Sequence, residues 1–200
     1  LNRPVSYVFT REESIQQSHK RHGIRTHIRL GADHTGILTA LEARAVMDGG
    51  AYVNESPIVT WKSTNCGAGP YRFPAVYYEN KAVMTNNMVC GAMRGFGTPQ
   101  AIFALESAMN ELAQRLHMNP LELRRKNFLR RGDTTASGQL LQGHVVSINT
   151  VAQRVAQTIR FDEKFETYSH QTGSIRRGVG IACSIRGVSF GADSEDVGRA

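Results

Sequence analysis

The chain has little of what marks a membrane, secreted or disulfide-stabilised protein. No apolar run approaches the roughly 18–20 residues that a membrane-spanning helix needs, and no charged-then-apolar leader opens the sequence. There are three cysteines, and their wide spacing and odd number predict neither a disulfide framework nor a CxxC site: Cys66, Cys90 and Cys183. We therefore expect a protein of a reducing, cytoplasmic compartment with no membrane partner.

Motifs for protein-ligated metals and for nucleotide phosphates are missing as well. The seven histidines show neither HxxxH nor HExxH spacing, so a zinc site built from side chains is not expected. The sequence contains neither a GxxxxGK[ST] loop nor a strand–GxGxxG–helix unit, which excludes the common nucleotide-binding loops. We expect no metal to be held by direct side-chain ligation.

What the chain does have is a surplus of positive charge. Its 200 residues include 24 Lys and Arg against 17 Asp and Glu, which gives a net charge of +7. This balance favours an anionic partner, and a basic nucleic-acid-binding module is one interpretation. The basic stretches 124–126 and 130–131 flank a predicted helix, however, where a solvated face or an acidic protein partner is the simpler explanation.

Strand patterns come first, helical patterns follow and a strand pattern returns. This order predicts an α+β fold with mixed or antiparallel sheets and packed helices. The expected strands lie at 4–10, in an antiparallel hairpin over 27–46, in a second strand pair at 76–78 and 82–85, and at 178–183.

Helices are predicted from their caps and apolar stripes. Thr10 and Glu13 form a capping-box pattern ahead of a short helix. Thr98 is expected to cap the strongest helix, with Pro99 in its first turn. The apolar stripe of that helix recurs at steps of three and four: Ile102, Leu105, Met109, Leu112 and Leu116. Two further helices are expected, one after Asn119 and one after Ser147 that carries Val151, Val155 and Ile159.

The ends and the composition suggest how the chain is divided. It opens directly on a strand pattern and stops soon after another, so we expect a piece of something longer. The expected division is a sheet plus helix pair over 1–131, a loop over 132–146 and the start of a following subdomain over 147–200.

The segment Gly91–Gln100 combines features that suit an anionic ligand. Two glycines, Gly95 and Gly97, surround an aromatic residue just before the best predicted helix. Glycine lets a backbone approach a ligand closely, and a helix N-terminus presents free N–H groups. Arg94 adds a permanent cation, and Phe96 offers a ring face for a planar substrate. A glycine-rich turn around an ordinary core phenylalanine is the alternative.

The sequence from Ala92 to Gln100 resembles the RGFGxPQ signature of the molybdenum-binding subunit in the xanthine dehydrogenase and aldehyde oxidase family of molybdenum hydroxylases. Other stretches resemble landmarks of that family and occur in the family order: Thr10–Glu13, Gly49–Tyr52, Gly69–Pro74 and Pro120–Asn127. The resemblance covers most of the chain and implies a fragment of a molybdopterin-binding domain.

The resemblance also implies an activity. Members of the family hydroxylate an electron-poor carbon with oxygen from water at a pterin-bound molybdenum, and electrons leave through 2Fe-2S clusters and commonly FAD on other domains or subunits. The implied substrate is a purine or another aromatic N-heterocycle, with an aldehyde as the alternative. Iron–sulfur and flavin domains are then the expected partners, and nucleic acid is not.

Residue by residue, the resemblance assigns roles to the motif. It implies that Arg94, Gly95 and Gly97 bind the molybdenum-pterin cofactor and that Phe96 holds a planar substrate. Phe190 resembles the second substrate aromatic of the family, with a core residue as the alternative.

Other positions depart from the family pattern. Gly191 stands where some relatives place a hydroxyl near the substrate. Lys62 stands where purine-oxidising relatives have a substrate-polarising arginine, and it keeps the charge but loses the bidentate fork. A solvated surface lysine is the alternative. The catalytic glutamate base of the family is expected outside this chain, so the fragment is expected to hold no catalytic residue and to be inactive alone.

Overall fold

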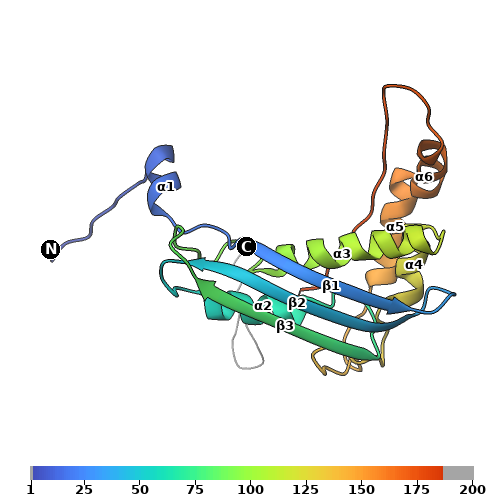
Figure 1. Ribbon diagram of the computed structural model, residues 1–200, viewed down its shortest axis with the longest axis horizontal. Coiled ribbons are helices and arrows are strands. Elements are labelled where there is room, and N and C mark those ends of the chain that lie inside the picture. The colour runs from blue at the N-terminus through green and yellow to red at the C-terminus, as the bar shows by residue number, and fades with distance from the viewer. Residues whose placement is uncertain (1, 187–200) are drawn as a thin grey trace.

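A computed structural model describes residues 2–186 and gives an α+β fold around one mixed three-stranded sheet (Figure 1). The strands are β1 (Ile24–Ala32), β2 (Leu38–Gly50) and β3 (Ala75–Met84), in the spatial order β1-β2-β3. The helices are α1 (Arg11–Gln17), α2 (Ser56–Cys66), α3 (Thr98–Arg115), α4 (Pro120–Asn127), α5 (Ile148–Ile159) and α6 (Phe161–Ser169). The predicted α+β class is confirmed.

The first hairpin is confirmed. β1 and β2 pair antiparallel from Ile24 opposite Met47 to Ala32 opposite Leu38. The turn between them is fixed by Asp33, whose carboxylate accepts hydrogen bonds from the backbone N–H groups of Thr35 and Ile37. Alternate residues of β2 point into the core and are almost fully buried: Leu41, Ala43, Ala45 and Met47.

The second predicted strand pair is wrong, because residues 75–84 form one continuous strand. β3 runs parallel to β2, with Glu79 opposite Arg44 and Asn80 opposite Ala45. Glu79 and Asn80 lack the glycine that favours a two-residue hairpin turn, and the thirteen-residue β2 offers a full-length partner instead. The Asn80 side chain donates to Ser63 Oγ at 2.7 Å, which ties this point of the strand to α2.

The strands expected at 4–10 and 178–183 are also wrong in the described part of the chain. The apolar side chains of the first segment lie in water, with Val5 72% and Val8 84% exposed, because no neighbouring strand covers them among residues 2–186. In the second segment the backbone N–H of Cys183 donates to the Glu106 carboxylate at 2.9 Å. In a strand this N–H would instead donate to a backbone carbonyl of a neighbouring strand.

The core lies between the sheet and the helices that cover one of its faces. α3 packs against β1, α2 packs against β3, and the two helices contact each other (Figure 1). The predicted stripe of α3 is confirmed, with Leu105 and Met109 fully buried. Asn119 caps α4 as expected, since its side chain accepts from the N–H of Leu121 at 2.8 Å.

The third predicted helix is confirmed, but its expected apolar face is only partly right. In α5 the buried residues are Ala152 and Ala156, whereas Val151 and Val155 are about half exposed. Ala152, Ala156 and Phe161 belong to the same hydrophobic cluster as the sheet and α3. The boundary of a following subdomain at 147 stays a prediction.

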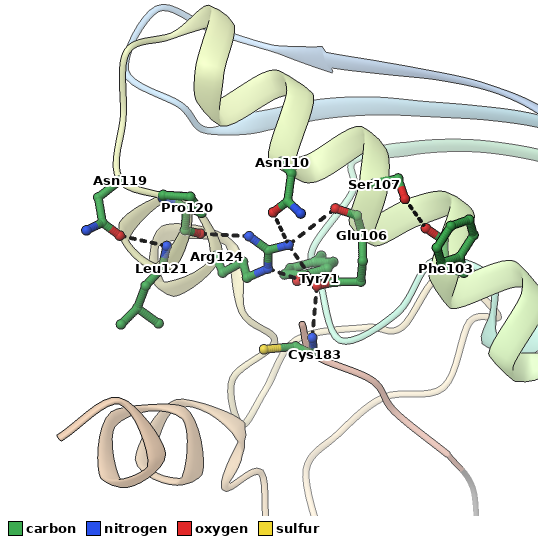
Figure 2. Close-up of polar contacts among 10 residues, drawn as sticks. All are labelled: Tyr71, Phe103, Glu106, Ser107, Asn110, Asn119, Pro120, Leu121, Arg124 and Cys183. Atoms are coloured by element: carbon green, nitrogen blue, oxygen red, sulfur yellow. Dashed lines mark hydrogen bonds and ion pairs between the residues drawn. The ribbon is translucent and has the colours of Figure 1, made fainter. Parts of the chain in front are cut away.

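A buried polar cluster joins α3, α4 and the chain beyond α6 (Figure 2). Arg124 and Glu106 form an ion pair of 2.8 Å, and their side chains are 0% and 6% exposed. The Tyr71 hydroxyl donates to the other carboxylate oxygen of Glu106, and Arg124 also donates to the side chain of Asn110. Burial is the main cause that raises the pKa of Tyr71, and it raises the pKa of the Cys183 thiol to about 11.

Neither a membrane span nor a metal-binding side-chain cluster occurs in residues 2–186. Among these residues no helix is both long and apolar enough to cross a bilayer. The same residues contain no group of three His, Cys, Asp or Glu side chains that could hold a metal ion.

Candidate functional site

The loop before α3 has an unusual backbone. Gly95, Phe96 and Gly97 follow one another with φ angles of +102°, +48° and +80°, all in the left-handed region. Glycine adopts this region freely, but a bulky residue does so at a cost. Phe96 is therefore held in a strained conformation, half-buried, by the residues on either side of it.

Gly97 is needed first for packing inside the protein. A Cβ at Gly97 would lie 2.7 Å from the Cβ of Ser63 and 2.8 Å from the carbonyl oxygen of Val59, both on α2. Gly97 is also the N-cap of α3, so the expected cap at Thr98 is wrong, and Thr98 is the first residue of the helix. The left-handed N-cap replaces a side-chain cap because α2 leaves no room for a side chain there.

The Arg94 side chain is exposed at the open edge of this loop. Its backbone carbonyl accepts a hydrogen bond from the Arg21 guanidinium at 2.9 Å. Gln100, in the first turn of α3, donates to the backbone carbonyl of His22 at 3.1 Å. The Arg21 guanidinium thus lies at the N-terminus of α3, since it also donates to the Gln100 side chain at 3.4 Å, and this arrangement attracts an anion.

The buried hydroxyl of Thr98 indicates which kind of ligand the start of α3 can bind. The residue is only 6% exposed, and its hydroxyl oxygen has no hydrogen-bond partner within the described residues. An unpaired buried hydroxyl is costly, and a polar ligand that receives its hydrogen bond removes that cost. The start of α3 therefore fits an anionic group such as the phosphate of a cofactor.

Lys62 lies on the helix that packs against this loop. It shares with Val59 and Ser63 the spacing that places residues on one helix face, and it is only 7% exposed. Its ammonium nitrogen lies 5.8 Å from the ring centroid of Trp61. The alternative of a solvated surface lysine is therefore wrong, whereas a role toward substrate stays a prediction.

The predicted site residues are only partly brought together in the described structure. Arg94, Gly95, Phe96 and Gly97 form one loop, and Lys62 lies on the helix against which Gly97 packs. The predictions for Phe190 and Gly191 fall outside the described residues.

A second polar network anchors the chain that leads into the loop. The Asp48 carboxylate, at the end of β2, accepts hydrogen bonds from the Thr85 hydroxyl, the Asn87 amide and the Gly50 N–H. These bonds, led by that of Thr85, lower the pKa of Asp48. Sequence analysis missed this network, because nothing in the sequence shows that residues 48 and 85–87 are neighbours.

Sequence analysis also missed the side chains that contact the loop from a distance. His19 and Glu55 bond to the backbone of Ala92, and Asn54 bonds to the carbonyl of Cys90. These residues lie 36 to 73 positions from their partners, and no local pattern marks them.

The sequence matches a protein family and several known proteins over most of its length. The model of the family described as molybdopterin cofactor-binding domain matches residues 1–128, a range that includes the whole loop and α2. The chain is 39% identical over 189 residues to a probable xanthine dehydrogenase subunit from Bacillus subtilis, covering 94% of this chain and 25% of that protein. It is 41% identical over 149 residues to the nicotinate dehydrogenase large molybdopterin subunit of Eubacterium barkeri, covering 74% and 35%.

Solved structures agree with the α+β architecture. The aldehyde oxidoreductase from Desulfovibrio gigas superposes with a TM-score of 0.75 at 28% identity, covering 83% of this chain and 18% of that one. The chain spans about a quarter to a third of the length of the two curated relatives.

Proposed function

The chain belongs to the molybdopterin cofactor-binding domain family, and from this membership we propose that it forms part of the cofactor and substrate site of a molybdenum hydroxylase. The observation that carries the proposal is the loop Arg94–Gly97 at the start of α3, where the buried Thr98 hydroxyl lacks a partner among the described residues. The loop and the helix lie inside the matched residues.

In this proposal Arg94 and the first turn of α3 hold the cofactor. The Arg94 guanidinium and the positive end of the α3 dipole neutralise negative charge on it, and the Thr98 hydroxyl donates a hydrogen bond. Gly97 keeps the loop close to α2, and Gly95 lets it turn close to Pro99 in the first turn of α3, while the Arg94 side chain stays exposed. When bound, the molybdenum-pterin cofactor supplies the redox chemistry that hydroxylates the substrate with oxygen from water.

The substrate is held by aromatic and basic side chains. Phe96, fixed by its left-handed backbone, presents a ring to a planar substrate. Phe190 and Gly191 are proposed to form the opposite side. Lys62, buried on α2, is proposed to donate a hydrogen bond to a polar substituent of the substrate.

The substrate class follows from the relatives. The two relatives at 39% and 41% identity are named for xanthine and nicotinate, which are aromatic N-heterocycles, whereas a relative named as an aldehyde oxidoreductase is 31% identical. An aromatic N-heterocycle is therefore the proposed substrate, and an aldehyde is the second candidate because of the structural likeness at a TM-score of 0.75.

The proposed partners and domain limits come from the same premise. Electrons would leave through 2Fe-2S clusters, and in some assemblies FAD, on other domains or subunits. The base that activates the oxygen donor would lie outside this chain. Residues 1–131 would form the part that carries the loop, with a connecting loop at 132–146 and a following subdomain from 147.

Two substitutions in the intact protein test the proposed roles. Arg94→Ala should lower the molybdenum content at least about fivefold, because it removes a charge-assisted bond to the cofactor. Phe96→Ala should leave the molybdenum content unchanged and raise KM for the substrate by about tenfold, because it removes a ring contact. The metal is measured by elemental mass spectrometry.

Arg154→Ala, which removes an exposed arginine of α5 at the opposite end of α3 from the loop (Figure 1), is the control and should change neither quantity. Equal loss of molybdenum in the Arg94 and Phe96 variants would contradict the separation of roles.

A further inference from the structure

Both backbone polar groups of Ala92 are held by side chains from distant parts of the chain. The Ala92 N–H donates to the Glu55 carboxylate at 2.7 Å. The Ala92 carbonyl lies 2.9 Å from Nε2 of His19. A carbonyl oxygen only accepts, so His19 must carry a proton on Nε2 to make this bond.

The neighbouring backbone is also held by contacts with distant parts of the chain. The Gly91 N–H donates to the carbonyl of Lys20 at 3.0 Å, and the Cys90 carbonyl accepts from the Asn54 amide at 3.1 Å. A Cβ at Gly91 would lie 2.6 Å from the Asn54 amide nitrogen and 2.8 Å from the His19 ring. The His19 and Asn54 side chains are therefore in close contact with the chain that enters the loop.

Glu55 is directed at Ala92 rather than at its own helix. It is the N-cap residue of α2, yet its side chain makes no capping hydrogen bond. A short aspartate side chain in this position would ordinarily satisfy the first N–H groups of the helix, whereas the longer glutamate reaches Ala92 instead. Its bond to Ala92 is charge-assisted, and this class of hydrogen bond is about twice as strong as one between neutral groups.

We propose that His19 and Glu55 are positioning residues that fix Ala92 and thereby set the Arg94–Gly97 loop for its cofactor. Only Met93 separates Ala92 from Arg94, so a shift of Ala92 moves the Arg94 backbone with it. The Arg94 carbonyl accepts a hydrogen bond from Arg21, which holds the backbone on the other side of Met93. The inference rests on the proposed function for the identity of the ligand. The link between the position of Ala92 and that of the loop, called the mechanical link below, rests on the contacts alone.

Hydrogen exchange in the intact protein tests the mechanical link. The amides of Phe96 and Thr98 bond inside the loop, to the carbonyls of Met93 and Gly95, and neither bonds to Glu55 or His19. Glu55→Ala and His19→Ala should each speed exchange of these two amides by about tenfold, because each removes one bond that keeps the loop closed. Glu55→Gln keeps an acceptor oxygen and should stay near the wild-type rate.

Molybdenum content of the same samples tests the consequence for the cofactor. Glu55→Ala and His19→Ala should lower it at least about threefold, while Glu55→Gln retains it. Glu12→Ala removes an exposed carboxylate of α1 outside this contact and serves as the control for both measurements.

Two results would overturn the inference. One is wild-type exchange of the Phe96 and Thr98 amides in both alanine variants. The other is faster exchange with full molybdenum content, which would leave His19 and Glu55 as purely structural contacts. If the wild-type protein itself holds no molybdenum, the proposed function fails, whereas the exchange rates still decide whether Ala92 controls the loop.

Discussion

Glu106 and Arg124 make an ion pair that is almost fully removed from water. Burying two charges costs several kcal/mol each, and their attraction offsets that cost only when their remaining hydrogen-bonding groups are satisfied. Here they are, since the carboxylate accepts from Tyr71 and Cys183, and the guanidinium donates to Asn110 (Figure 2). The pair therefore binds α3, α4 and the chain near Cys183 into one unit.

Removing one partner should be costly. Arg124→Met leaves the Glu106 charge buried without compensation and should lower the free energy of unfolding by roughly 3–5 kcal/mol, measured by urea denaturation. Arg115→Met is the matched control, because its pair with Glu111 lies in water and should cost less than about 1 kcal/mol. Adding Glu106→Gln to Arg124→Met should restore part of the loss, and a double variant less stable than the single one would contradict this account.

The elements differ in what stabilises them. α1 buries no residue, so its helical state depends on its own cap rather than on packing. The cap is a complete capping box, in which the Glu13 N–H donates to the Thr10 hydroxyl and the Thr10 N–H donates to the Glu13 carboxylate. α3, in contrast, is stabilised by a buried apolar stripe and needs no side-chain cap.

The cap of α1 should respond to pH. The backbone hydrogen bond from Thr10 is the main cause that lowers the pKa of Glu13 from its usual 4.5. A lowered pKa means that the stabilisation is complete above the unfolded value and is lost as the pH falls through the folded value. Amide exchange in α1, corrected for its intrinsic pH dependence, should therefore rise between about pH 6 and about pH 3.

Glu13→Gln should remove most of this pH response, because it removes the titrating carboxylate, and should leave the global unfolding midpoint unchanged, because α1 is not packed on the core. Persistence of the full response in Glu13→Gln would contradict the role of the Glu13 carboxylate in the cap.

The elements that could be predicted are those marked by residues close together in the sequence. The caps at Thr10 and Asn119 and the stripe of α3 are encoded by residues a few positions apart, and the sequence predicted these helices correctly. α2 has no clear apolar stripe, and its position is set by tertiary contacts such as that between Ser63 and Gly97. β3 was misread because its length is set by β2, whose paired residues lie 34 or 35 positions earlier in the chain.

At the scale of the whole molecule, the residues of the candidate site that are adjacent in the sequence could be predicted. The residues that the fold brings to it from distant positions could not. Arg94, Gly95, Phe96 and Gly97 stand in one short motif, so the sequence alone pointed to them. His19, Arg21 and Glu55 reach the same loop through the fold, and only coordinates reveal them. Gly97 also serves packing against α2, whereas the sequence had suggested that the glycines allow a ligand to approach the backbone closely.

The structure of the loop changes the interpretation of the net charge of +7, which at first suggested a nucleic-acid partner. Part of it lies at the start of α3, where Arg21 and Arg94 suit an anionic cofactor. A nucleic-acid-binding module would instead spread its basic side chains along a surface that follows a phosphate backbone. The family match over residues 1–128 favours the cofactor.

The molybdenum content of the intact wild-type protein tests the central claim most directly. Protein produced in a molybdate-supplied host and freed of loosely bound metal should contain about one molybdenum atom per polypeptide, by elemental mass spectrometry. The absence of molybdenum, together with nucleic-acid binding that weakens steeply with salt, would contradict the account.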